Sequence, residues 1–316
     1  MNKKLKAFLT GFAYLAPALI ILLSFRIIPI LFSVRISLYD WGMAGARKFL
    51  GFANYLQVLA DPIFWQSLLN TFWYAVFTVP MMLFLSLFLA ILLNSKIKGL
   101  GIYRTLYYLP VVTSIVAVSI IWKWLFNPER GLLNYLLSLV HASPIHWLED
   151  PRGIFTLIFE PIGIHLPSGL AGPSVALCSL VVMSIWKGLG YNIIIFLAGL
   201  QNIPNAYYEA AKIDGAGTFR LFRNVTWPLL TPITFYILVM STIVAFEAFA
   251  QVWIMTGPPP GGPLGTTKVV MYYFYEQSFE LWRMGYGASI AFIAFLIILA
   301  LTIFQRRFLE KRVHYA

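Results

Sequence analysis

The sequence predicts an all-α integral membrane protein with six spans. Hydrophobic residues make up 60% of the 316 residues, charged residues only 11%, and the mean hydropathy is +0.78. Because soluble domains are nearer half apolar and a quarter charged, this composition excludes a soluble globular chain and a disordered one. The apolar runs reach the roughly 20 residues that a helix needs to cross a bilayer, and they lack the alternating pattern of barrel strands.

The apolar runs are spread from end to end of the chain, which favours one membrane-embedded body. They cover roughly residues 9–33, 68–93, 106–126, 174–199, 229–254 and 286–304. The first run follows Lys3, Lys4 and Lys6 and therefore imitates a signal peptide. It is too long for the apolar region of such a peptide, and no small-residue cleavage site follows it. We therefore expect it to be retained as the first membrane helix.

The distribution of Lys and Arg predicts the orientation of these spans. Most cations outside the spans lie in the two terminal segments and in the loops 94–105 and 200–228. Loops rich in Lys and Arg stay on the cytoplasmic side, so both termini are expected there. The chain then divides into a cytoplasmic N-terminus (1–8), a transmembrane domain (9–306) and a cytoplasmic tail (307–316).

No residue pattern predicts a catalytic, metal or nucleotide site in this chain. Cys178 is the only cysteine, which excludes an internal disulfide and a thiolate-ligated cluster, and the four His follow no metal-ligand spacing. The glycine- and proline-rich stretch 257–268 resembles a phosphate loop only superficially, because Lys268 follows Thr267 instead of Gly. We therefore expect no cofactor bound by this chain and no enzymatic activity of its own.

The segment 203–232 is a polar stretch between two spans and has its own helix pattern, from Pro204 through Phe222. Its distinctive residues combine small side chains, two acids and an aromatic ring: Glu209, Ala210, Ala211, Asp214, Gly215, Ala216 and Phe219. A helix lying on the membrane surface would instead show a continuous apolar stripe and a Lys/Arg-rich face. The pattern favours a short helix whose exposed side docks into a groove of a cytosolic partner.

This segment closely resembles the EAA loop of permease subunits of bacterial ATP-binding-cassette (ABC) importers. The resemblance extends to FLGFANY (49–55), YRTLYYLP (103–110), MTG (255–257) and MGYGASIAF (284–292), and thus to most of the chain from about residue 10 to 306. It is closest to the carbohydrate-uptake branch, which includes maltose, glycerol-phosphate and trehalose systems.

The resemblance implies the six-helix fold of type I importer transmembrane domains, with a cytoplasmic coupling helix. In that family the EAA loop inserts into a cleft of the ATPase subunit, which implies that role for Glu209, Ala210, Ala211, Asp214, Gly215, Ala216 and Phe219. ATP and Mg²⁺ would be used by that partner. The implied partners are a second homologous permease, two ATPase subunits and an external solute-binding protein, in the bacterial cytoplasmic (inner) membrane.

Two stretches depart from the family pattern. An insertion at about 152–173 separates Trp147 and Leu148 from the fourth span, and Pro258–Pro260 stands where the family often has glycines after MTG. Both stretches are expected outside, where a binding protein would dock. They leave the details of that docking open.

Polar residues within spans predict the substrate pathway, because such groups are costly in lipid and usually face the protein interior. The polar candidates in the fourth and fifth predicted spans are Ser184, Trp186, Lys187, Tyr191, Asn192, Ser241, Thr242, Glu247 and Gln251. The contact positions that the family resemblance implies fall on Ser184, Lys187, Gly188, Tyr191, Ser241, Ala245 and Ala248, and contact at the two alanines would be by packing. Trp186 has helix packing as its alternative role, Lys187 has extension to the interface, and Glu247 has a structural ion pair.

Two other classes of function stay open from the sequence. A secondary transporter would be expected to show duplicated halves and ionisable relays, and we find no internal repeat. A structural membrane anchor of an enzyme complex would not need an EAA loop. The solute is also open, since a disaccharide, a glycerol-phosphate ester, a glycoside osmolyte and an oligosaccharide all fit.

Overall fold

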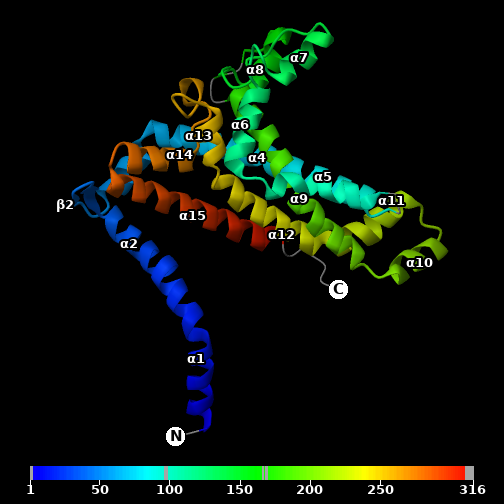
Figure 1. The fold of residues 1–316 in the computed structure, drawn as a ribbon, viewed down its shortest axis with the longest axis horizontal. Coiled ribbons are helices and arrows are strands. Elements are labelled where there is room, and N and C mark those ends of the chain that lie inside the picture. The colour runs from blue at the N-terminus through cyan, green and yellow to red at the C-terminus, as the bar shows by residue number, and fades with distance from the viewer. Residues whose placement is uncertain (1–2, 96–98, 166, 168–169, 310–316) are drawn as a thin grey trace. The chain divides into compact units, whose positions relative to one another are not determined.

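The computed structural model describes residues 3–95, 99–165, 167 and 170–309 (Figure 1). Parts of four predicted segments therefore lie outside the described residues, namely 1–2 at the N-terminus, 96–98 of the loop 94–105, 166 and 168–169 of the insertion, and 310–316 of the tail. The chain divides into two compact units, Met1–Asp61 with Phe274–Phe295, and Pro62–Tyr273 with Leu296–Ala316.

The first unit begins with a long apolar helix. It consists of α1 (Lys3–Leu22), a π-helical turn η1 (Leu23–Ile27) and α2 (Ile28–Ser37). Its stretch Phe8–Ser37 is long and apolar enough to cross a membrane, and its most apolar window contains no buried residue. The predicted first span, 9–33, is confirmed and extended by a few residues.

A β-hairpin that the sequence pattern did not predict follows this helix. Strand β1 (Tyr39–Gly42) pairs antiparallel with β2 (Gly45–Phe49), and Tyr39 stands opposite Phe49 with the ring centroids 5.1 Å apart. After α3 (Ala53–Ala60), the unit is completed by the π-helical turn η6 (Glu276–Glu280) and the first part of α15 (Met284–Leu309).

Asn54 joins these pieces of the first unit. Its buried amide donates to the backbone oxygens of Ser37 (2.8 Å) and Tyr39 (3.0 Å). Gly285 allows α15 to approach the hairpin, because a Cβ there would lie 2.1 Å from the Tyr39 oxygen. The resemblance motifs at 49–55 and 284–292 thus meet in one packed region.

The second unit is built on α4 (Pro62–Leu93), α9 (Val175–Gln201) and α12 (Trp227–Phe246), which pack against one another. Their apolar core includes the fully buried Ile193, Phe196, Leu230 and Ile237. A glycine on α9 permits the close approach of α5 (Leu100–Val112), because a Cβ on Gly190 would lie 2.1 Å from the backbone oxygen of Tyr107.

The predicted third span, 106–126, is not one straight helix. It consists of α5 and α6 (Ile115–Leu125), whose axes are bent by 100°. Thr113 is extended, and the side chain of Ser114 accepts from the Val116 N–H to cap α6. The length of an apolar run indicates how many residues lie in the membrane, but it says nothing about the direction of the helix axis. The bend was therefore not predictable from hydropathy.

The predicted fifth span, 229–254, is also interrupted. A helix of α11 (Thr218–Leu221), a π-helical turn η4 (Phe222–Thr226) and α12 ends at Phe246. The chain turns at Glu247–Phe249 before the short helix α13 (Ala250–Met255). Among the described residues, five helices are long and apolar enough to cross a membrane, and the bent α5–α6 pair makes up to six.

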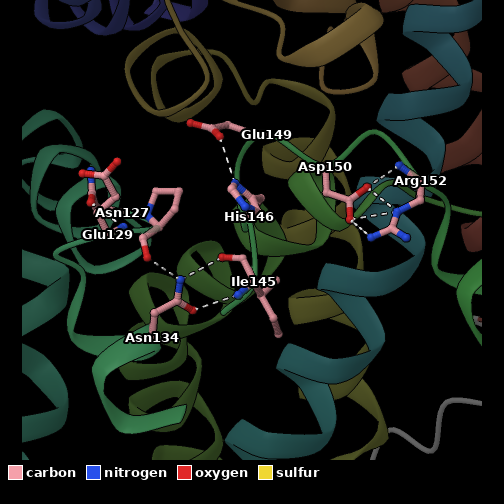
Figure 2. Close-up of polar contacts among 9 residues, drawn as sticks. Asn127, Glu129, Asn134, Ile145, His146, Glu149, Asp150 and Arg152 are labelled. Carbon is pink, nitrogen blue, oxygen red and sulfur yellow. Dashed lines mark hydrogen bonds and ion pairs between the residues drawn. The ribbon is translucent and has the colours of Figure 1, made fainter. Parts of the chain in front are cut away.

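The segment before α9 contains α7 (Leu132–Leu139), α8 (Ile154–Phe159) and a 3₁₀ turn η2 (Glu160–Ile162). The amide of Asn134 donates to the backbone oxygens of Pro128 (2.9 Å) and Ile145 (3.0 Å), and these bonds are drawn at the lower left of Figure 2. Figure 2 also shows Arg152 bonded to Asp150 at 2.6 Å. The Arg152 side chain lowers the pKa of this carboxyl, so the ion pair persists at neutral pH.

The chain between α13 and η6 packs back onto α4. It contains a 3₁₀ turn η5 (Pro263–Gly265) and α14 (Val270–Tyr275). The amide of Asn70 donates to the backbone oxygens of Gly265 and Lys268, both at 2.9 Å. A polar side chain within an apolar helix is thus used to hold an irregular loop.

Candidate functional site

A cavity of about 310 Å³ lies among α4, α9 and α12, with α6 and α13 contributing one residue each. Its walls combine apolar side chains with a few hydroxyl and amide groups. The lining residues are Tyr74, Thr78, Met82, Ile115, Ser184, Lys187, Gly188, Tyr191, Asn192, Met240, Ser241, Val244, Ala245 and Gln251. Such a mixture of apolar walls and few polar groups is typical of small-molecule sites.

Most residues that the sequence pattern selected for the pathway line this cavity. They are Ser184, Lys187, Gly188, Tyr191, Asn192, Ser241 and Gln251, together with Ala245 from the family count. Gly188 makes room for a neighbour, since a Cβ there would lie 2.6 Å from the methyl carbon of Met82. Residues far apart in the sequence are thus brought to one surface by the packing of α4, α9 and α12.

Four of the candidates do not line the cavity, namely Trp186, Thr242, Glu247 and Ala248. The Trp186 ring packs against Trp122 of α6 at 5.7 Å between centroids. Glu247 is exposed at the C-terminal end of α12, and Ala248 is buried in the turn that follows. The helix break at Glu247 explains its position, because a continuous helix would have placed this carboxylate among the span residues.

Tyr74 and Thr78, both on α4, are cavity residues that the sequence reasoning missed. The Tyr74 hydroxyl donates to the Ser184 hydroxyl at 2.6 Å and accepts from the Gln251 amide at 3.1 Å. The two residues stand four positions apart within an apolar helix and so share a face. That spacing of polar groups was the signal that could have identified them.

Two polar groups of the cavity have no hydrogen-bond partner within the described part of the chain. The amide nitrogen of Asn192 and the hydroxyl of Thr78 are buried, with each residue only 3% exposed. Buried polar groups are nearly always paired, and an unpaired one costs about 1–3 kcal/mol. These two groups therefore offer hydrogen bonds to a molecule that enters the cavity.

The side chain of Lys187 is held by backbone oxygens at the end of α5. Its ammonium donates to the oxygens of Pro110 (2.7 Å), Val111 (3.1 Å) and Thr113 (2.9 Å). These oxygens stand where α5 ends, and the last carbonyls of a helix lack partners within it. Lys187 thus connects the cavity wall to the bend between α5 and α6.

The segment 203–232 begins with two helices instead of the single helix predicted from Pro204 to Phe222. Pro204 caps α10 (Asn205–Ile213), which is followed by a turn and then by α11. Gly215 lies in the turn with φ +74°, a left-handed conformation that favours glycine. Figure 1 shows α10 at the end of α9 that is opposite to α7 and α8.

This segment presents both apolar and charged side chains on its surface. Ile213 is 87% exposed and Phe219 72%, and the predicted contact residues Glu209, Ala210, Asp214 and Gly215 are exposed. Ala211 and Ala216 are half-buried. Large exposed apolar side chains next to charges are typical of a docking surface.

Comparison with known proteins now identifies the family. A family model described as "Binding-protein-dependent transport system inner membrane component" matches residues 59–315. The chain belongs to this family. This confirms the resemblance inferred from the EAA loop and its flanking motifs, and the protein is a multi-pass ABC transporter permease.

Curated relatives of this permease align over nearly its whole length. The probable ABC transporter permease protein YesP of Bacillus subtilis is 36% identical over 97% of this chain and 92% of its own. The lactose transport system permease protein LacF of Rhizobium radiobacter is 34% identical over 93% and 92%. The sn-glycerol-3-phosphate transport system permease protein UgpA of Agrobacterium fabrum is 35% identical over 85% and 84%.

A solved structure supports the fold of the permease. A chain of the bacterial alginate ABC transporter, in complex with alginate pentasaccharide-bound periplasmic protein, matches with a TM-score of 0.78 and 21% identity. The match covers 96% of this permease and 95% of that chain. The predicted fold class, a type I importer transmembrane domain, is therefore confirmed.

Proposed function

We propose that this permease carries a sugar or sugar-like solute through the cavity between α4, α9 and α12. The observation that carries the proposal is the pair of unpartnered groups in that cavity, the Asn192 amide and the Thr78 hydroxyl. A sugar presents hydroxyls that both donate and accept, so it matches these groups. Relatives named for lactose, trehalose/maltose, arabinooligosaccharides and sn-glycerol-3-phosphate support this solute class.

This cavity has surfaces that match both the flat apolar face of a sugar ring and its hydroxyl groups. Tyr191 supplies an aromatic ring for the flat apolar face of a pyranose, while Ser241 and the Tyr74–Ser184–Gln251 group supply polar contacts. Gly188 and Ala245 leave room at the wall. Trp186 and Glu247, which lie outside the lining, are assigned to packing on α6 and to the helix end, respectively.

The segment 203–232 is proposed to couple this movement to ATP hydrolysis in a separate subunit. Ile213 and Phe219 would enter an apolar groove of the ATPase, and Glu209 and Asp214 would fix the register. Ala210, Ala211 and Ala216 allow a close approach, and Gly215 holds the turn between α10 and α11. Because α10 and α11 lie between α9 and α12 in the sequence, a rigid-body shift of this segment would then move both of these helices.

The remaining parts of the assembly follow from the same proposal. The partners are a second homologous permease, two ATPase subunits that use ATP and Mg²⁺, and an external solute-binding protein. This chain binds no cofactor and is not catalytic alone. We also propose that its termini are cytoplasmic in the bacterial inner membrane and that the insertion at 152–173 is on the outer side, as the distribution of Lys and Arg predicts.

The test is ATPase activity of the purified complex in lipid, with and without the binding protein and a panel of neutral and acidic sugars. We expect one liganded binding protein to stimulate hydrolysis and that same solute to be taken up. The proposal fails if no ATPase subunit co-purifies and uptake follows an ion gradient, because a secondary transporter would then be the correct class.

A further inference from the structure

Two lysines, on α9 and α6, each bind backbone oxygens at the C-terminal end of a helix that borders a break. Lys187 donates to the oxygens of Pro110 and Val111 in the last turn of α5 and to that of Thr113 directly after it. Lys123 donates to the oxygens of Ile254 (3.1 Å) and Gly257 (2.8 Å), at the end of α13. The same arrangement therefore occurs twice. It is found at the end of α5, before the break in the third span, and at the end of α13, after the break in the fifth span.

Electrostatics explains why lysine suits these positions. The C-terminal end of a helix carries partial negative charge and unpaired carbonyls, and an ammonium supplies positive charge and three donors. Among the described residues that line the cavity, none is acidic. The partial negative charge at the C-terminal end of α5 therefore balances the charge of Lys187, and no carboxylate is needed beside it.

The three bonds of Lys187 also decide what it can offer to a solute. An ammonium has three N–H donors, and all three point to backbone oxygens in this structure. An anionic solute would have to displace one of those oxygens before it could bond to Lys187. The Asn192 amide and the Thr78 hydroxyl, by contrast, are unpartnered among the described residues and need no such exchange.

The two lysines act on helices that complete the cavity. Lys187 fixes the bend from which α6 starts, and Ile115 at the first position of α6 lines the cavity. Lys123 extends from α6 to the end of α13, and Gln251 of α13 lines the cavity and bonds to Tyr74. α6 and α13 also pack against each other.

We propose that Lys187 and Lys123 are positioning residues that hold α6 and α13 together as one wall of the cavity. Lys187 keeps the bend of the third span, Lys123 ties the two short helices together, and neither lysine provides a free charge for the solute. The inference rests on the proposed function only in treating the cavity as part of the pathway.

The test measures local opening of α6 without requiring a solute. Val118 of α6 is 2% exposed, so a Val118→Cys thiol in a Cys178→Ser background should react slowly with a water-soluble methanethiosulfonate reagent in membranes. We expect Lys187→Met to raise the labelling rate about tenfold, since losing charge-assisted bonds changes an opening equilibrium by at least that factor. Lys187→Arg, which keeps charge and donors, should restore the slow rate.

A matched site separates local from general loosening. Val181 of α9 is 5% exposed, and labelling of Val181→Cys should stay the same in all variants. Lys123→Met provides a second route if Lys187→Met fails to accumulate, and it should also speed labelling at Val118→Cys. Because both lysines act on one wall, the double variant should label no faster than about twice the faster single variant.

An unchanged labelling rate at Val118→Cys in both methionine variants would overturn the proposal, as would an equal rise of the rate at Val181→Cys.

Uptake gives a second readout in the reconstituted complex. Lys187→Met should lower the maximal rate for neutral and anionic solutes alike, whereas a selective rise in KM for an anionic solute would mean that Lys187 contacts it. Failure of uptake in the parent complex would refute the proposed function. The labelling result would still test the role of the two lysines, because it does not depend on transport.

Discussion

Asn192 and Gly190 stand two positions apart on α9 and illustrate two different demands on single residues. The side chain of Asn192 reaches the cavity with its amide nitrogen unpartnered among the described groups. Gly190 contributes no side chain, because α5 occupies the space where a Cβ would lie. The first residue concerns the solute, and the second concerns the approach of two helices.

Replacing Asn192 with leucine, which has a similar size, should weaken solute recognition without unfolding the chain. One neutral hydrogen bond contributes about 1 kcal/mol, so KM for uptake should rise about fivefold. Ser86→Ala is the matched control, since the Ser86 hydroxyl bonds within α4 to the Met82 oxygen and does not line the cavity. An unchanged KM in Asn192→Leu would remove this residue from the proposed pathway.

Gly190→Ala should destabilise the permease. The new Cβ would lie 2.1 Å from the backbone oxygen of Tyr107, and forcing an extra methyl into a packed core costs about 1–3 kcal/mol. Gly101→Ala on α5 is the control, because no atom lies within 4 Å of its added Cβ. Thermal inactivation of the two variants in detergent should therefore differ, with only Gly190→Ala inactivating at a lower temperature.

At the scale of secondary-structure elements, the interrupted helices matter most. In straight spans the backbone oxygens of the cavity walls would be paired within regular helix. The breaks at 113–114 and 247–249 instead leave backbone oxygens without a partner in the helix and produce short helices. Lys187 and Ser114 bond to backbone groups at the first break, and Lys123 bonds to the Gly257 oxygen after α13, the short helix that follows the second break. A membrane tolerates irregular backbone where neighbouring helices or polar side chains satisfy it in this way.

The helices α10 and α11, which we propose contact the ATPase, give a prediction at the same scale. Glu209→Lys reverses an exposed charge, and Gly215→Asp adds a charge at a turn with φ +74°. Both variants should insert into the membrane yet abolish transport, because the proposed ATPase contact is lost. Gly217→Ala, at φ −73° with open space around it, should transport normally. Wild-type uptake in Glu209→Lys would contradict the coupling assignment.

At the scale of the whole molecule, the orientation in the membrane can be tested with two glycines of similar geometry. Gly99 and Gly163 have φ +79° and +83°, and neither has an atom within 4 Å of an added Cβ. In a Cys178→Ser background, Gly163→Cys should react with an impermeant maleimide on intact cells. Gly99→Cys should react only after permeabilisation, because positively charged loops stay inside. The reverse pattern would invert the proposed topology.

The sequence by itself determined the membrane class, the approximate extent of the spans and the family. These features depend on local quantities: the length of apolar runs, the spacing of small residues, and motifs such as the EAA loop at 203–232. Polar residues within spans also pointed to six of the cavity-lining residues, including Ser184, Tyr191 and Asn192. Such groups are costly in lipid wherever they stand, so the sequence alone marks them.

Only the tertiary structure decided where the helices break and which side chains meet. Hydropathy does not register a 100° bend, since both halves are apolar, and it placed Glu247 within a span although the chain turns there. Tyr74 meets Gln251, 177 residues away, because α4 and α13 border the same cavity. Lys187 is fixed by oxygens 74 to 77 residues earlier. These contacts depend on the direction of each helix, which packing between distant segments sets.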